Sequence, residues 1–247
     1  MKTYKTSEIA RLAGVHPNTV RLYEEWGILP RAKRLQNGYR VFTEFHVSQI
    51  RLCRTALRGE VLQNGLRKLA LQILHTSAAG EIESAVGLAG QYMERIKQEK
   101  KHAEEALALA EHKFCTPLRE QEDSLLTRRQ TADWLQVTPD TLRNWELNGL
   151  LRVKRKANGY RVYNAGDLAR LEIIRALRSA NYSLNAILRM MSQVENSSCP
   201  NFKKSIDTPS AAEDIVTACD HLLTALDEIF KDVQSMLRQL EEMRKNF

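Results

Sequence analysis

The chain of 247 residues carries 37 Lys and Arg against 30 Asp and Glu, which gives a formal net charge of +7 and an isoelectric point near 9.3. The excess of positive charge favours a polyanionic partner, and no apolar run approaches the length that would span a membrane, so a membrane partner is not expected. The N-terminal sequence has no apolar signal stretch, and the four cysteines (Cys53, Cys115, Cys199 and Cys219) show no metal-type spacing. We therefore expect a reducing, cytoplasmic location and neither a metal nor another cofactor.

The two halves of the chain repeat one pattern. Residues that recur with identical spacing 122 positions later are Val15, Pro17, Thr19, Arg21, Glu24, Gly27 and Leu29, whose second copies are Val137, Pro139, Thr141, Arg143, Glu146, Gly149 and Leu151. The pentapeptide Asn37-Gly38-Tyr39-Arg40-Val41 likewise returns as Asn158-Gly159-Tyr160-Arg161-Val162. Chance does not preserve the spacing of so many residues, so we expect two copies of one folded unit in a single chain.

The first copy begins with signals for two short helices. Thr6 or Ser7 can cap the first helix, which Gly14 ends, and Pro17 stands at the start of a second helix that Gly27 ends. Proline is favoured at the first helical position because its missing N–H would have no intrahelical partner there. Two short helices joined by a tight turn predict a helix-turn-helix.

A hairpin and further helices complete the first domain. Asn37-Gly38 is a turn dipeptide typical of hairpins, and the alternating residues after it predict a short strand with basic flanks. Helical segments at 45–56 and 65–74 then fill out a domain that we assign to residues 1–75. The expected fold of this domain is a winged helix-turn-helix.

A long helix is expected next, at residues 80–115. Its seam positions alternate in steps of four and three residues, at Ile82, Val86, Ala89, Met93, Ile96, Lys100, Ala103, Leu107, Ala110 and Phe114. A heptad register of this length predicts a coiled coil, here with a seam rich in alanine and broken once by Lys100.

The second copy repeats this order at residues 123–194, with a capping-box spacing at Thr127 and Gln130 and a hairpin turn at Asn158-Gly159. We expect a loop at 195–210 and a second long helix at 211–247. The bulkier seam of that helix is at Ile215, Cys219, Leu222, Leu226, Ile229, Val233, Met236, Leu240, Met243 and Phe247. The predicted fold class is mainly α, with two winged helix-turn-helix domains, each followed by a long coiled-coil helix.

The order of these elements resembles the MerR family of bacterial transcription regulators. The resemblance rests on residues 19–24, 27–29 and 37–42 of the first copy and 141–146, 149–151 and 158–163 of the second. It implies a DNA-binding regulator that bends or untwists promoter DNA, with double-stranded DNA as its partner and RNA polymerase at a promoter as a further one. Family members ordinarily dimerise through the long helix, so the duplication implies either an intrachain antiparallel coiled coil or a homodimer of chains. We favour the intrachain pair, because the small and the bulky seam suit each other.

Candidate DNA-binding residues lie at the front of each second helix and in each wing: Asn18, Thr19, Arg21, Tyr39 and Arg40 in the first copy, and Asp140, Thr141, Arg143, Tyr160 and Arg161 in the second. The helix arginines stand where a recognition helix meets the groove, and the wing arginines suit phosphate contact. The polar residues at the helix fronts are candidate base readers or caps. The wing tyrosines are candidates for backbone contact or for packing inside the wing.

The two copies differ at positions that matter for recognition. The family usually has an aromatic residue where Leu22 and Asn144 stand, so one contact is not carried over. Asp140 takes the place of Asn18, and an acid there repels phosphate but can accept from the amino group of cytosine. We therefore expect the copies to prefer different sequences, or the second to bind more weakly. The aromatic residues Tyr23, Trp26 and Trp145 are expected in the core.

Two other classes of function are considered. An architectural DNA-bending protein of the excisionase kind, without a direct regulatory role, is the alternative to a regulator. Phosphate-loop, HExxH and serine-elbow motifs are absent from the sequence, so we expect neither an enzyme nor catalytic residues.

Overall fold

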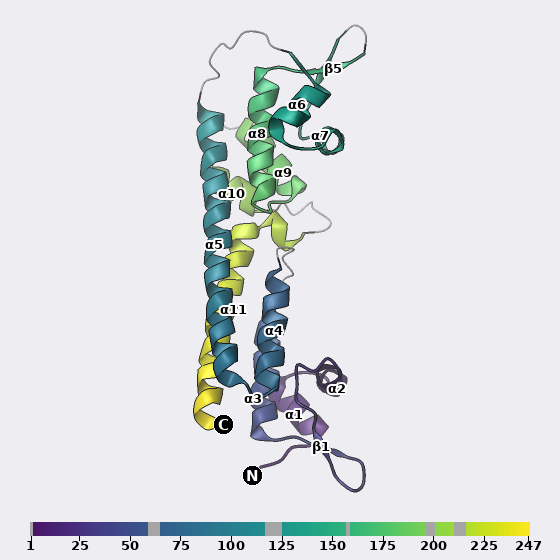
Figure 1. Ribbon diagram of the computed structural model, residues 1–247, viewed down its shortest axis with the longest axis vertical. Helices are drawn as coiled ribbons and strands as arrows, with labels where there is room; N and C mark the ends of the chain where they lie inside the picture. Colours follow the sequence, from purple (N-terminus) through teal and green to yellow (C-terminus); the bar gives the residue numbers. More distant parts are fainter. Residues whose placement is uncertain (1, 59–64, 117–124, 157–158, 196–200, 210–215) are drawn as a thin grey trace. The chain divides into compact units, whose positions relative to one another are not determined.

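The structure, a computed structural model, describes residues 2–58, 65–116, 125–156, 159–195, 201–209 and 216–247 (Figure 1). Asn158, Cys199 and Ile215, which the sequence analysis singled out, lie outside the described residues. The chain divides into a first compact unit, Met1–Gln98 with Ala225–Phe247, and a second compact unit, Glu99–Thr224. This division differs from the sequence repeat, because most of the last helix packs with the first copy.

In chain order the first compact unit contains α1 (Thr6–Ala13), α2 (Pro17–Glu25), β1 (Lys33–Arg34), β2 (Arg40–Val41), α3 (Glu44–Ala56), α4 (Leu66–Ala78), the first half of α5 (Ile82–Cys115) and most of α11 (Leu222–Asn246). The predicted helix-turn-helix is confirmed as α1 and α2. Gly14 between them has a φ of 63°, a left-handed conformation that glycine adopts without strain. The antiparallel pair β1 and β2 forms the predicted wing.

A buried glutamine joins α3, α4 and the end of the helix-turn-helix. Gln49 donates from Nε2 to the carbonyl oxygens of Ile28 (2.8 Å) and Leu74 (3.0 Å), and its Oε1 accepts from Ser77 Oγ (3.0 Å). Because these bonds satisfy the polar group, its burial is not penalised. Apolar side chains that complete this core are Ile9, Val20, Phe42, Ile50, Leu52 and Ile73.

Within the first compact unit, α5 and α11 run antiparallel. Arg244, near the end of α11, pairs with Glu83, near the start of α5, at 3.2 Å between Nη1 and Oε2. Asp232, earlier in α11, faces Tyr92, which is later in α5. Burial raises the pKa of Tyr92 to about 12, and the nearby Asp232 carboxylate adds to this rise.

The last helix also contacts α3. Gln239 Nε2 donates to Thr55 Oγ1 at 2.9 Å, and Arg58, just after α3, pairs with the buried Asp232. α11 therefore packs on the helix that follows the first wing as well as on α5.

The buried face of α5 is broader than the predicted seam. Val86 and Met93 are only half-buried, whereas Ala85, Tyr92 and Ala106 are buried. An α-helix that packs against several neighbours buries a stripe wider than the strict heptad positions. In the last helix the expected seam positions are buried at Leu222, Leu226, Ile229, Val233, Met236, Leu240 and Met243, with Leu223, Ala225 and Asp232 buried beside them. The last predicted seam residue, Phe247, is instead 54% exposed.

In chain order the second compact unit contains the second half of α5, β3 (Leu126–Thr127), α6 (Arg128–Leu135), α7 (Pro139–Leu147), β4 (Lys154–Arg155), β5 (Arg161–Tyr163), α8 (Ala165–Ser179), α9 (Leu184–Glu195), α10 (Phe202–Asp207) and the 3-10 turn η1 (Ala218–Asp220). The helix-turn-helix α6–α7 lies beside α8 (Figure 1). The wing sheet has the order β3-β5-β4. Among the described residues, no helix is both long and apolar enough to cross a membrane.

The predicted loop at 195–210 is not entirely a loop, because its described part includes α10. This helix is fixed against α9, from which the Arg189 side chain donates to the carbonyl oxygens of Ser205 (3.1 Å) and Ile206 (2.7 Å). The sequence pattern of the stretch did not reveal the helix, because this anchor comes from another element.

The second long helix begins at Leu222, later than the expected start at 211. Asp207, at the end of α10, accepts from the backbone N–H groups of Leu223 (2.8 Å) and Thr224 (3.1 Å) and so caps α11. The cap defines where the helix starts, and the preceding residues form η1 instead of a further helical turn.

We expect Asp207→Ala to lower the free energy of unfolding by about 1 kcal/mol, because the change removes an N-cap and leaves N–H groups of α11 unpaired. Urea unfolding followed by circular dichroism measures the difference. Asp133→Ala, at an exposed position on α6, is the matched control and should change stability by less than about 0.5 kcal/mol. Equal effects of the two substitutions would contradict the capping role.

Candidate nucleic-acid interface

The front of α2 carries the predicted contact residues of the first copy. Asn18 and Arg21 are exposed, and Thr19 is half-buried. His16 Nδ1 accepts from the N–H of Asn18 (3.2 Å) and caps the helix, while Arg21 Nη1 donates to Asn18 Oδ1 (3.1 Å). Because this last bond uses only Oδ1 of Asn18, its amide N–H groups can still meet a base edge.

The front of α7 has the same geometry and different chemistry. Asp140 and Arg143 are exposed, and Thr141 is half-buried. Thr138 Oγ1 accepts from the N–H of Thr141 (3.1 Å) and lies 2.9 Å from its hydroxyl, so Thr141 takes part in the helix cap. The second copy therefore offers a carboxylate where the first offers an amide.

An ion pair ties each wing to its recognition helix, and we call this arrangement the wing clamp. Arg40 Nε lies 2.6 Å from Glu24 Oε2, and Arg161 Nε lies 2.6 Å from Glu146 Oε2. The two carboxylate side chains are 11% and 10% exposed, so both pairs are largely shielded from water. The sequence pattern indicated the arginines but not the carboxylates as site residues, although Glu24 recurs as Glu146.

The wing clamp of the second copy has additional partners. Glu146 Oε1 accepts from the hydroxyl of Tyr163 (2.6 Å), and Arg128 Nη2 lies 3.3 Å from Glu146 Oε2. Burial, and then the hydrogen bond to Glu146, raise the pKa of Tyr163 to about 12, so its hydroxyl stays a donor at neutral pH. In the first copy Thr6 stands in place of Arg128 and Phe42 in place of Tyr163, so the guanidinium and the phenol hydroxyl are both missing.

The wings are exposed and basic. Tyr39 and Tyr160 are each 70% exposed, so neither ring is packed inside its wing. Exposed basic residues on the flanks are Arg31, Lys33 and Arg34 in the first copy and Arg152, Lys154, Arg155 and Lys156 in the second. Aromatic hydroxyls beside clustered positive charges suit contact with a sugar–phosphate backbone.

The expectation that all three aromatic residues of the recognition helices are core residues is wrong for one of them. Tyr23 and Trp145 are buried, whereas Trp26 is 51% exposed. Trp26 follows the last residue of α2, and its ring centroid stands 6.1 Å from that of Tyr23. Its equivalent in the second copy is Asn148.

The described residues include no group of three His, Cys, Asp or Glu side chains that could hold a metal ion. Cys53 is a core thiol: its Sγ donates to the carbonyl oxygen of Ile28 at 3.3 Å, and burial raises its pKa well above the usual range. Such a thiol is a poor metal ligand at neutral pH, because the thiolate is the form that binds.

Comparison with known proteins gives one family for both copies. A family model described as MerR family regulatory protein matches residues 5–42, and one described as MerR HTH family regulatory protein matches residues 126–194. The HTH-type transcriptional regulator CueR of Escherichia coli O157:H7 is 36% identical over 50 residues, which are 20% of this chain and 37% of the relative. The HTH-type transcriptional regulator ZntR of Escherichia coli K12 is 36% identical over 64 residues, which are 26% of this chain and 45% of the relative.

The match covers less than half the length of these curated relatives. No solved structure matches the chain significantly. The family models cover the helix-turn-helix and wing of the first copy and residues from β3 into α9 of the second.

We expect the wing clamp to stabilise its copy more than an exposed ion pair does. A double-mutant cycle of Glu24→Gln and Arg40→Gln in denaturant unfolding should give a coupling free energy of about 1–2 kcal/mol, because the pair is largely shielded from water. The same cycle on the second clamp should give at least as much. The exposed pair Glu94–Lys97 on α5 is the control and should give about 0.3 kcal/mol. Clamp couplings no larger than the control would show that the pairs do not hold the wings.

Proposed function

The chain carries two tandem units of the MerR family, and we propose that it is a sequence-specific, DNA-binding transcription regulator in which one chain supplies the readers of both half-sites. The observation that carries this proposal is the repeated wing clamp, in which the wing arginine and the recognition-helix glutamate lie 2.6 Å apart in both copies. The helix that reads bases and the wing that contacts the backbone must bind the same duplex together. A link between them fixes their relative positions for that purpose. Its presence in both copies supports the same role for each.

The front of each recognition helix reads bases in this proposal. Arg21 and Arg143 are placed to enter the major groove beside the first turn of the helix. An asparagine such as Asn18 suits adenine, which offers an acceptor and a donor to its amide, whereas the carboxylate of Asp140 suits the amino group of cytosine. The two copies therefore prefer different bases at equivalent positions.

The wings hold the DNA backbone. The Nε atoms of Arg40 and Arg161 are paired with the glutamates of the clamps. The Nη1 and Nη2 groups of these arginines are therefore the donors for a phosphate. Tyr39 and Tyr160, at the exposed wing tips, reach the sugar–phosphate backbone. These contacts carry affinity for DNA of any sequence and orient the helices for base reading.

A single-chain arrangement is supported by the antiparallel stretches of α5 and α11 in the first compact unit. The last helix of the second copy closes onto the first copy, as a partner chain would in a dimer. Two non-identical readers in one chain fit an operator that is not a perfect inverted repeat. In our proposal, phosphate contacts offset the elastic cost of bending or untwisting a promoter for RNA polymerase.

We expect binding to duplex DNA to depend steeply on salt. About four to six phosphate contacts from the two wings correspond to a slope of roughly −4 to −5 in a plot of log affinity against log salt concentration. Fluorescence anisotropy titrations with a duplex selected from a random pool measure the slope. A flat response, or no binding to any selected duplex, would refute DNA binding.

We expect Asp140→Asn to change the preferred base at one half-site and leave the other half-site unchanged. The preference should move from cytosine towards adenine by about fivefold or more, because one amide replaces one carboxylate at a base edge. Selection from a random duplex pool, followed by competition titrations, reads the change. Asn18→Asp is the reciprocal variant and should alter only the opposite half-site; changes at both half-sites, or at neither, would show that these residues do not read bases.

A further inference from the structure

We propose that Arg175 on α8 binds a DNA backbone phosphate while it also fixes the helix-turn-helix turn, and that Arg54 on α3 does the same in the first copy. This inference rests on the proposed DNA-binding function and adds contact residues that lie outside the helix and wing motifs.

The groove opens at the front of the recognition helix of the second copy. It is a cavity of about 680 Å³ lined by Asp140, Thr141 and Asn144 of α7 and by Arg175 and Arg178 of α8. A DNA strand whose bases are read by the front of α7 has its backbone beside that helix, so this groove is where a phosphate would lie. Two guanidinium groups on its wall supply the charge that a phosphate requires.

Arg175 has donors beyond those that the protein uses. Its Nη1 donates to the carbonyl oxygen of Leu135 at 2.9 Å, at the last residue of α6. The residue is nevertheless exposed, and a guanidinium carries five N–H donors in a rigid fork. One N–H group of Arg175 therefore binds the carbonyl at the turn, and its other N–H donors face the groove.

The first copy has the same contact. Arg54 Nη1 donates to the carbonyl oxygen of Ala13, the equivalent last residue of α1. The arginine lies so close to the turn that a Cβ on Gly14 would be 2.9 Å from its Nη1. The contact therefore recurs in both copies and holds the guanidinium beside the turn before each recognition helix.

The arginines of the groove also explain how the second copy tolerates an acid at its recognition front. Where Asp140 replaces Asn18, Arg178 replaces Leu57. Arg178 lines the same groove as Asp140, and its Nη1 donates to the carbonyl oxygen of Tyr182 in the turn before α9. The added guanidinium offsets the added carboxylate, so the groove keeps a net positive charge for a phosphate.

The test separates the phosphate contact from the turn contact by one substitution. Arg175→Gln removes the charge and keeps an amide N–H that can donate to the Leu135 carbonyl. With the full chain and a short duplex of mixed sequence, the slope of log affinity against log salt should become less steep by about 0.9, which is about an eightfold loss of affinity at 0.1 M salt. Arg54→Gln should have the same effect, and thermal unfolding checks that each variant stays folded.

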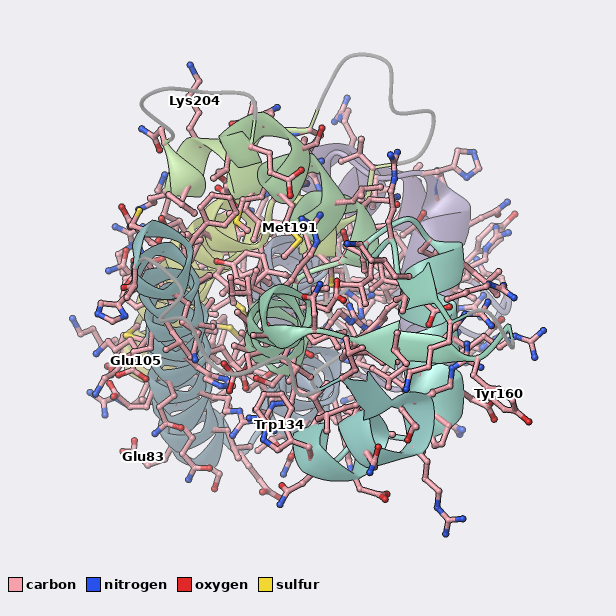
Figure 2. All side chains as sticks on the ribbon, turned by 90° about the horizontal axis from the view of Figure 1, so that it is seen from above. Glu83, Glu105, Trp134, Tyr160, Met191 and Lys204 are labelled. Carbon is pink, nitrogen blue, oxygen red and sulfur yellow. The ribbon has the colours of Figure 1, made fainter. Side chains whose placement is uncertain are left out.

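Lys204→Gln is the matched control for the loss of one positive charge. Lys204 lies on α10, on the opposite side of this unit from Tyr160 at the wing tip (Figure 2), so its variant should keep the wild-type slope. If Arg175→Gln lowers the melting temperature, Arg175→Lys supplies the comparison. The slope of the Lys variant should be steeper than that of the Gln variant by about 0.9, because lysine retains the positive charge.

An unchanged slope in Arg175→Gln, or equal slopes in the Gln and Lys variants, would overturn this inference. Those outcomes leave the proposed function intact as long as the wild-type chain binds the duplex with a steep slope. Failure of the wild-type chain to bind any duplex would instead refute the proposed function itself.

Discussion

A carboxylate on each recognition helix holds the arginine of the following wing, and the rest of the proposed interface depends on this contact. The strands of the first wing are two residues long, and those of the second are two or three. A hairpin of that size is not stable alone in water. The pairs Glu24–Arg40 and Glu146–Arg161 connect each hairpin to a helix that is itself packed on the domain core. Under the proposed function, the residues that read bases and those that contact the DNA backbone are thereby linked to one another.

The two copies use this support differently. In the second copy Tyr163 and Arg128 add to the clamp. The same copy carries Asp140 at its reading front and Arg178 in the groove beside it. Under the proposed function, this divergence gives one chain two readers that differ, whereas a dimer of identical chains has two identical readers.

Much of the architecture could be predicted from the sequence, because its signals are local. Gly14, Pro17 and the Asn37-Gly38 turn each act within a few residues, and they mark the helix-turn-helix and the wing correctly. The family resemblance adds the order of the elements. A residue that recurs in both copies indicates a constraint that the copies share.

The features that the sequence did not reveal depend on contacts between distant residues. The start of α11 is set by Asp207 from another helix, and α10 is fixed by Arg189 of α9. Trp26 is exposed although it is apolar. Its exposure depends on the end of α2 in the folded domain, which the residue type alone does not predict. The glutamate of each clamp likewise looks like an ordinary surface residue in the sequence, because its partner is an arginine of the folded wing.

The composition of the protein–DNA complex tests the central claim most directly, which is that a single chain carries the readers of a whole site. Analytical ultracentrifugation of the chain with a duplex selected from a random pool gives the number of chains per duplex, and the selected sequences give the symmetry of the site. One chain per duplex on a site without inverted symmetry is the predicted result. Two chains on a perfect inverted repeat, with each chain engaging through only one of its copies, would contradict it.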